Sequence, residues 1–194
     1  MSKRHFRDIK KVVILLLVSF LAYSTYYSDY VQTKYFYPFP YKEEIHQAGI
    51  QYQLNTNLVL AIIKNESKFE ANAISANGAM GLMQIMPDTG KWIATQTKKE
   101  AFHTKMLLDP NTNIRFGSWY LSELNAEFYQ NDILVLAAYN AGRGNVQEWI
   151  KKYGWNKNFS NINEIPFPET QVYIRRILHD KQMYAKYYSH IQMR

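Results

Sequence analysis

A glutamate at the end of an apolar helical stretch is the residue best suited to chemistry. Glu66 follows residues 58–63, which are all apolar, and it lies four residues after Ile62 and three after Ile63. On a helix it therefore extends the same apolar face. Burial and the negative end of a helix dipole both disfavour the ionised carboxylate, so this group can keep a proton near neutral pH and act as a general acid. The alternative is a glutamate that caps or salt-bridges a helix end.

The segment after Glu66 has the composition of a groove floor. Residues 71–87 are rich in alanine, glycine, methionine and amide side chains. Gly78 and Gly81 permit backbone conformations or close approaches that a side chain would block. Ser75 and Gln84 can hydrogen-bond the hydroxyls or acetamide of a sugar. The alternative is a tight interhelical loop in which buried methionines serve as filler.

Helical patterns run through nearly all of the chain after residue 40, and strands are hard to find. The clearest repeat follows Asp109-Pro110 and places apolar residues at alternating spacings of three and four from Ile114 to Phe128. Further helices are expected at 41–52, 57–69, from 87 or 88, 133–140, 145–153 and from 168 onward. We predict an all-α fold, a compact helical bundle with a substrate groove, formed by residues 41–194.

Composition and charge favour one exported domain. The 194 residues are 47% hydrophobic, enough for a single core, and the formal net charge is +7. The first 11 residues carry a net +4 of this, so the rest keeps a mild positive balance that suits a polyanionic surface such as a cell wall. The chain has no basic run interleaved with exposed aromatic residues, which is the pattern that would indicate nucleic-acid binding. Absence of cysteine excludes disulfides and fits a bacterial exported protein.

The N-terminus has the pattern of an export signal or signal anchor. Basic residues precede an apolar run at 12–22, and tyrosines follow up to Tyr27. The 16 residues from 12 to 27 fall short of the ~20 needed to cross a bilayer core, although interfacial tyrosines can extend the span. No convincing cleavage site follows Ala22, so we expect residues 1–27 to form an uncleaved single-pass anchor in a bacterial membrane, with the domain outside the cytoplasm. Cleavage and secretion is the alternative. Residues 28–40, with Pro38 and Pro40, are expected to form an extended linker.

Four motifs occur in order along the expected domain. They are Glu66-Ser67-x-Phe69 with Ser75-x-x-Gly78-Ala79-x-Gly81-Leu82-Met83-Gln84-Ile85-Met86-Pro87; Asn113-Ile114-x-x-Gly117-x-x-Tyr120-Leu121; Ala137-Ala138-Tyr139-Asn140-Ala141-Gly142; and Ile165-Pro166-Phe167-x-Glu169-Thr170-x-x-Tyr173. Together they closely resemble the catalytic domain of soluble lytic murein transglycosylases, glycoside hydrolase family 23. The resemblance covers about residues 41–187. One departure is Arg143, which stands where family members often have proline.

The resemblance implies a lysozyme-like fold and cleavage of the β-1,4 bond between MurNAc and GlcNAc of peptidoglycan, with formation of 1,6-anhydroMurNAc ends. It implies that Glu66 is the sole catalytic acid/base. It also assigns a set of substrate-binding positions, of which two, Asn140 and Tyr173, rest only on lying inside matched motifs. The full set is Ser75, Gln84, Met86, Tyr139, Asn140, Glu169 and Tyr173.

The carboxylates of the sequence agree with a single-acid mechanism. Ordinary glycosidases use two carboxylates, but no motif ties a second one to Glu66. Glu70 is one helical turn on and is expected to be solvated, while Glu169 is interpreted as an orienting group. Glu66 would act first as acid and then as base. Tyr139 either steadies Glu66 or the substrate acetamide, or is a buried aromatic residue whose hydroxyl is satisfied by backbone.

Rival functions remain open at this stage. A goose-type lysozyme-like hydrolase would share the fold but add water, and a wall-binding or assembly protein would lack activity. The activity could also serve a secretion, conjugation or phage apparatus. The five histidines show no metal-ligand spacing, so no metal or other cofactor is expected. The expected partners are peptidoglycan glycan strands and, through residues 12–27, a membrane.

Overall fold

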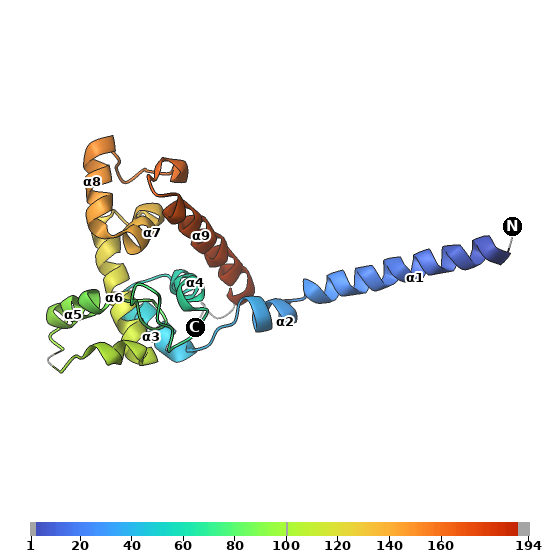
Figure 1. Ribbon diagram of the computed structural model, residues 1–194, viewed down its shortest axis with the longest axis horizontal. Helices are drawn as coiled ribbons and strands as arrows, with labels where there is room; N and C mark the ends of the chain where they lie inside the picture. Colours follow the sequence, from blue (N-terminus) through green and yellow to red (C-terminus); the bar gives the residue numbers. More distant parts are fainter. Residues whose placement is uncertain (1–2, 100, 190–194) are drawn as a thin grey trace. The chain divides into compact units, whose positions relative to one another are not determined.

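The computed structural model describes residues 3–99 and 101–189 and is built from helices (Figure 1). The predicted all-α fold class is confirmed. The chain divides into two compact units, residues 1–39 and 40–194. Residues 1–2 of the expected tail and 190–194 of the expected domain lie outside the described residues.

The first unit consists of α1 (Lys3–Tyr26), α2 (Asp29–Val31) and a π-helix (Gln32–Phe36). Residues Arg7–Tyr26 of α1 are long and apolar enough to cross a membrane, with 20 residues. The expectation of an extended segment throughout 28–40 is wrong, because residues 29–36 are helical. Neither proline nor glycine interrupts the backbone before Pro38, and the Ser28 hydroxyl caps the turn by accepting a hydrogen bond from the Val31 amide at 3.4 Å.

Within the described residues of the second unit there are seven α-helices, close to the predicted positions. They are α3 (Lys42–Gln51), α4 (Thr56–Ser67), α5 (Pro87–Gln96), α6 (Pro110–Glu127), α7 (Asp132–Ala141), α8 (Arg143–Tyr153) and α9 (Pro168–Tyr188). Helix α8 begins two residues before the predicted start, directly after Gly142, which ends α7 with φ +91°. Two short 3₁₀ helices, Thr104–Leu108 and Ile162–Glu164, were not predicted because so short a segment carries no helical period.

The core of this unit is built around α4 and α7. Residues 58–63 of α4 and 134–138 of α7 are all buried, so neither stretch has a solvent face. A helix that is apolar on every side must be enclosed by its neighbours. Helix α4 packs along α9, and α7 packs against α6, α8 and α9. This packing brings the end of α4, where Glu66 lies, against the C-terminal helix.

A buried asparagine of α6 ties the loop between α4 and α5 to that helix. Asn113 of α6 accepts a hydrogen bond from the Met83 amide at 2.7 Å and donates to the carbonyls of Met80 at 2.8 Å and Leu107 at 2.7 Å. Among the described residues, β-type pairing is limited to two isolated bridges, Ile74 with Met80 and Met80 with Ile85. The loop is therefore irregular in backbone but rigidly attached to α6.

Two glycines allow that attachment. Gly81 has φ +75°, and a Cβ at this position would lie 2.1 Å from the Leu107 carbonyl oxygen and 2.3 Å from Asn113 Nδ2. On α6, a Cβ at Gly117 would lie 2.4 Å from the sulfur of Met83. The expectation that glycine permits close approach in this loop is confirmed at Gly81.

Candidate active site

Glu66 lies in the last turn of α4, beside a cavity of about 450 Å³. Helix α4 ends at Ser67 and is followed by Lys68, whose backbone is left-handed. The buried Ser67 hydroxyl donates to the Leu82 carbonyl at 2.8 Å. The helix end and the loop are thereby held together around the cavity. The remaining lining residues are Asn65, Ser67, Lys68, Glu70, Asn72, Ala73, Ile74, Ser75 and Gln84.

The carboxyl of Glu66 holds its proton up to neutral pH. Burial disfavours the charged form and raises its pKa from 4.5 to about 7. The hydroxyl of Tyr173 donates a hydrogen bond to Glu66 Oε1 at 2.6 Å, which stabilises the carboxylate and acts in the opposite direction. A pKa near the working pH lets one carboxyl donate a proton and later accept one.

A buried carboxylate sets the position of α9 against α4. Asp180 is 6% exposed and accepts hydrogen bonds from Lys64 Nζ at 2.8 Å and Asn65 Nδ2 at 2.7 Å. Lys64 and Asn65 immediately precede Glu66, and Asp180 lies two helical turns after Tyr173, so the same two helix faces meet at both places. The ion pair thus fixes the register that brings Tyr173 to Glu66. Asp180 was not predicted from the sequence, although its seven-residue spacing from Tyr173 could have indicated a shared face.

Tyr139 supports the groove through the backbone. Its hydroxyl donates to the Met83 carbonyl at 2.8 Å, which corresponds to the second of the two roles considered from sequence. Burial raises its pKa well above the usual value, and the nearby Glu66 charge adds to this effect. Tyr139 is therefore a neutral group beside Glu66 that anchors the loop, whereas Tyr173 is the tyrosine bonded to the carboxyl.

Ser75 and Gln84, predicted to bind substrate, both line the Glu66 cavity. The Ser75 oxygen accepts from the Ala79 amide at 3.0 Å, and its hydroxyl proton stays available to a ligand. Gln84, with φ +47°, uses Nε2 to donate to the carbonyls of Ala73 at 3.2 Å and Gly81 at 2.9 Å. Its amide nitrogen therefore stabilises the loop, and its carbonyl oxygen is the atom left for a substrate.

Met86, Asn140 and Glu169 lie outside the lining of this cavity. Met86 is 43% exposed at the start of α5. Asn140 is exposed, and its Oδ1 accepts a hydrogen bond from the Thr170 hydroxyl at 2.7 Å, which joins α7 to α9. Glu169 is exposed in the first turn of α9, one turn before Tyr173 and on the same face. These residues can border a longer groove without touching the space beside Glu66.

A row of aromatic rings extends from Tyr139. Ring centroids lie 5.8 Å apart between Tyr139 and Tyr120, 6.1 Å between Tyr120 and Trp92, and 5.3 Å between Trp92 and Trp119. Arg143, the departure noted in the sequence, lies over Trp92 at 5.7 Å and pairs with Glu127 at 2.7 Å. It thus ties the start of α8 to α5 and α6.

The fold is helical and lysozyme-like, and it places a buried carboxyl, that of Glu66, at a helix end beside a cavity. Residues 43–162 match the transglycosylase SLT domain family. The chain belongs to this family.

Relatives and solved structures agree with this assignment. The chain is 36% identical to the soluble lytic murein transglycosylase of Salmonella typhimurium over 143 residues, 71% of the chain and 21% of that protein. Identity to the Escherichia coli protein of the same name is 33% over 144 residues, 73% of the chain and 22% of that protein. The chain thus spans about a fifth of the length of these relatives.

Two crystal structures share the fold. The 70 kDa soluble lytic transglycosylase of Escherichia coli gives a TM-score of 0.72 at 31% identity, covering 78% of this chain and 25% of that one. An inactive mutant of the lytic transglycosylase Slt of Pseudomonas aeruginosa gives a TM-score of 0.69 at 30% identity, covering 86% of this chain and 29% of that one. The resemblance noted in the sequence is confirmed.

The hydrogen bond from Tyr173 predicts a change in pH dependence. Because this bond lowers the pKa of Glu66, Tyr173→Phe should raise that pKa. The fall of kcat/KM above about pH 7 should then move to higher pH, by up to about one pH unit for a bond of this kind. The measurement is the pH profile of product release from purified peptidoglycan. Tyr139→Phe is the control, because the hydroxyl that it removes bonds to the Met83 carbonyl and not to Glu66. An equal shift of the pH profile in this variant would contradict the role given to the Tyr173 hydroxyl.

Glu66 should also make stability depend on pH. Its pKa is higher in the folded state than the unfolded value of 4.5, so its contribution is fully present below pH 4.5 and is lost as pH rises through about 7. Ionising the buried group costs about 3 kcal/mol. Glu66→Gln should therefore gain up to about 3 kcal/mol over the unmodified protein between pH 4.5 and 8 in urea unfolding. A stability difference that stays constant over this range would show that Glu66 is solvated.

Proposed function

We propose that this chain is a peptidoglycan lytic transglycosylase that cleaves the MurNAc-GlcNAc β-1,4 bond and leaves 1,6-anhydroMurNAc ends. The observation that carries the proposal is Glu66, a carboxyl with a pKa of about 7 beside a cavity lined by sugar-binding side chain types. Membership of the transglycosylase SLT domain family supports the same reaction.

In the first step Glu66 donates its proton to the glycosidic oxygen as the bond from that oxygen to C1 of MurNAc breaks. The substrate's own 2-acetamido oxygen stabilises the positive charge that develops at C1. Tyr173, bonded to Glu66 at 2.6 Å, stabilises the carboxylate that forms. In the second step Glu66 takes the proton of the MurNAc C6 hydroxyl while O6 bonds to C1. No water is consumed, and the carboxyl returns to its protonated state.

The proposed substrate contacts extend beyond the Glu66 cavity. Ser75 offers a hydroxyl and Gln84 a carbonyl oxygen to the glycan, for the reasons given above. Tyr139 and Tyr173 do not line the cavity, but they lie beside Glu66 and would border the reacting bond. Met86, Asn140 and Glu169 neither line the cavity nor bond to Glu66, and they would contact sugars further along the strand.

We further propose that residues 1–27 anchor the enzyme in a bacterial membrane and that residues 41–194 act on the wall outside the cytoplasm. The length and apolar character of Arg7–Tyr26 support an anchor, and they also fit a signal that is removed. Residues 28–40 would join the two parts. The experiment is mass analysis of the chain purified from membranes, where an intact N-terminus favours the anchor and loss of about the first 27 residues favours cleavage.

The reaction is tested by mass analysis of the muropeptides released from purified sacculi. The proposal expects anhydro ends. Products that are one water heavier would support the rival hydrolase. One observation favours that rival: Glu70 lines the same cavity as Glu66 and could serve as a second carboxylate. Saturable binding to sacculi without any released fragment would support a wall-binding protein instead.

A further inference from the structure

The Thr170 hydroxyl and the Asn140 side chain join the start of α9 to the end of α7. Thr170 is 2% exposed, and its Oγ1 donates a hydrogen bond to Asn140 Oδ1 at 2.7 Å. Within the described part of the chain, the Thr170 side chain makes no other hydrogen bond. A buried hydroxyl needs an acceptor for its proton. Thr170 therefore holds the Asn140 oxygen and fixes the orientation of the Asn140 amide.

This orientation leaves the NH₂ group of Asn140 available to a ligand. Asn140 is exposed, and its Nδ2 has no hydrogen-bond partner among residues 3–99 and 101–189. The reverse orientation of the amide would bring Nδ2 to Thr170 and leave the proton of a buried hydroxyl unpaired, which costs free energy. Asn140 thus presents two N–H donors whose direction is set by a buried neighbour.

The contact lies one helical turn from the bond between Tyr173 and Glu66. Thr170 and Tyr173 are three residues apart on α9, so they share a face and are separated by about 4.5 Å along the helix axis. On α7, Asn140 directly follows Tyr139, whose pKa is raised in part by the Glu66 charge. The free donors of Asn140 are therefore near the acid, although outside the lining of its cavity.

Donors that cannot turn over favour a carbonyl oxygen as their partner. A sugar hydroxyl both donates and accepts, whereas a carbonyl oxygen only accepts, so fixed N–H groups select the carbonyl. Glu169, exposed in the first turn of α9 and next to Thr170, disfavours a carboxylate such as that of a stem peptide. The uncharged carbonyl that both MurNAc and GlcNAc carry is that of the acetamido group.

We propose that Asn140 Nδ2 donates a hydrogen bond to the acetamido carbonyl oxygen of a sugar next to the reacting bond, and that Thr170 positions Asn140 for this contact. The inference rests on the proposed function, since the glycan strand is its substrate. Because Asn140 lies outside the Glu66 cavity, the contact is the same in the ground state and the transition state. It should therefore affect KM and leave kcat unchanged.

Asn140→Asp tests the donor directly. Aspartate keeps the shape of the side chain and still accepts the Thr170 bond, but it replaces the NH₂ group with a second acceptor that repels a carbonyl oxygen. Affinity for N-acetylated glycan oligosaccharides is measured by calorimetry in the Glu66→Gln chain, which prevents turnover. The added Asn140→Asp change should lower this affinity at least about tenfold. Unchanged affinity would overturn the donor role.

Thr170→Val tests the positioning. The change removes the hydroxyl but keeps the volume, and water can bind the exposed Asn140 oxygen, so the melting temperature should change little. KM for soluble glycan strands should rise about three- to tenfold with kcat unchanged, and Thr170→Ser should restore it. In an Asn140→Ala background, Thr170→Val should raise KM no further, because it acts through Asn140. A further rise, or a loss of kcat at constant KM, would overturn the positioning role.

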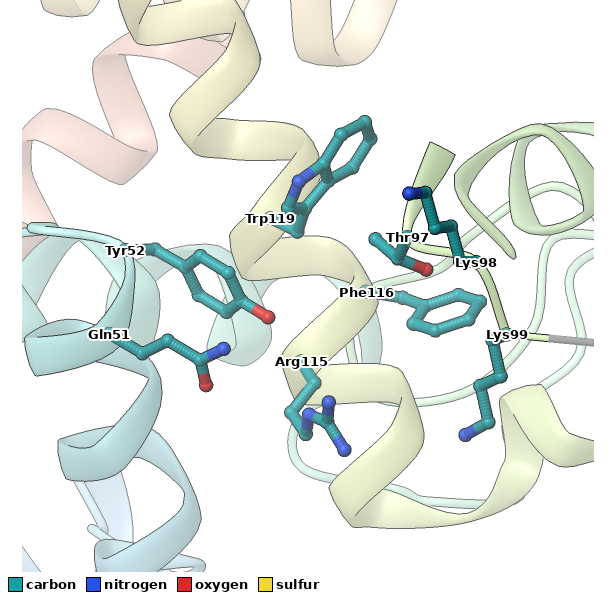
Figure 2. Close-up of a pocket in the computed structure, with 8 residues that line it drawn as sticks. All are labelled: Gln51, Tyr52, Thr97, Lys98, Lys99, Arg115, Phe116 and Trp119. Atoms are coloured by element: carbon teal, nitrogen blue, oxygen red, sulfur yellow. The ribbon is translucent and has the colours of Figure 1, made fainter. Parts of the chain in front are cut away.

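Thr97→Val is the matched control, because it removes a hydroxyl that donates to the Ile93 carbonyl at 2.8 Å. Thr97 lines a separate cavity of about 480 Å³ formed by α3, α5, α6 and the turn after α5 (Figure 2), which shares no lining residue with the Glu66 cavity. Its KM should be unchanged, and an equal rise would overturn the proposal. If the unmodified chain released no fragments, the reaction would be overturned, whereas a loss of affinity in Asn140→Asp would still support the contact.

Discussion

Glu66→Gln should reduce release of anhydro-muropeptides from sacculi by at least about 10³-fold, because one residue supplies both proton transfers and each is worth about 10²–10⁴-fold. Glutamine keeps the shape of the side chain and can still accept a hydrogen bond from the Tyr173 hydroxyl. The loss would therefore report on the proton and not on packing. Circular dichroism and the stability gain expected at high pH would show that the variant is folded.

Glu70→Gln is the matched control, since it makes the same change in an exposed carboxylate lining the same cavity. A single-carboxylate mechanism expects an effect of less than about tenfold, because Glu70 would then contribute only to substrate binding. A loss comparable to that of Glu66→Gln would indicate a pair of carboxylates and hence hydrolysis. Near-normal activity in Glu66→Gln would remove the proposed acid altogether.

Gly81→Ala should lower the free energy of unfolding by roughly 2–5 kcal/mol, the sum of two separate costs. The left-handed backbone costs an alanine about 1–2 kcal/mol, and overpacking adds about 1–3 kcal/mol. Overpacking is unavoidable here because the nearest atoms are the Leu107 carbonyl oxygen at 2.1 Å and the buried Asn113 amide at 2.3 Å. Any movement that relieves the contact breaks the hydrogen bonds that hold the groove floor. Urea unfolding measures the change, and activity should fall with it.

Gly78→Ala separates the two causes. Gly78 has φ +86°, similar to Gly81, but a Cβ there meets no atom within 4 Å. It should therefore show only the conformational cost, about 1–2 kcal/mol. Equal destabilisation by both substitutions would mean that the close approach at Gly81 is relieved without penalty.

The helices could be predicted because their signals are local. Pro110 after Asp109 and the three-four spacing up to Phe128 define α6 within the sequence itself, and Asp109 Oδ2 indeed caps it by accepting from the Thr112 amide at 2.8 Å. The burial of Glu66 could be predicted for a similar reason. Its position on an apolar helix face predicts burial, and burial raises its pKa.

The partners of Glu66 could not be predicted from local pattern. Tyr173 and Asp180 lie more than a hundred residues from the helix they bind, and no periodicity shows which faces of two helices meet. Tyr139 shows the same difficulty, because the choice between Glu66 and a backbone carbonyl depends on the path of a loop that has no regular structure. The prediction of an extended backbone was wrong for residues 29–36, because Pro38 and Pro40 restrict only the residues next to them.

The contacts between α4 and α9 also order events during synthesis. Glu66 leaves the ribosome about a hundred residues before Tyr173 and Asp180, which come from the last helix of the described domain. Until α9 packs, the carboxyl faces water and has an ordinary acidity, so it is ionised at neutral pH. A nascent or partly translocated chain therefore has no proton to give. In the mechanism that we propose, the protonated carboxyl needed for cleavage would therefore form only when α9 packs against α4.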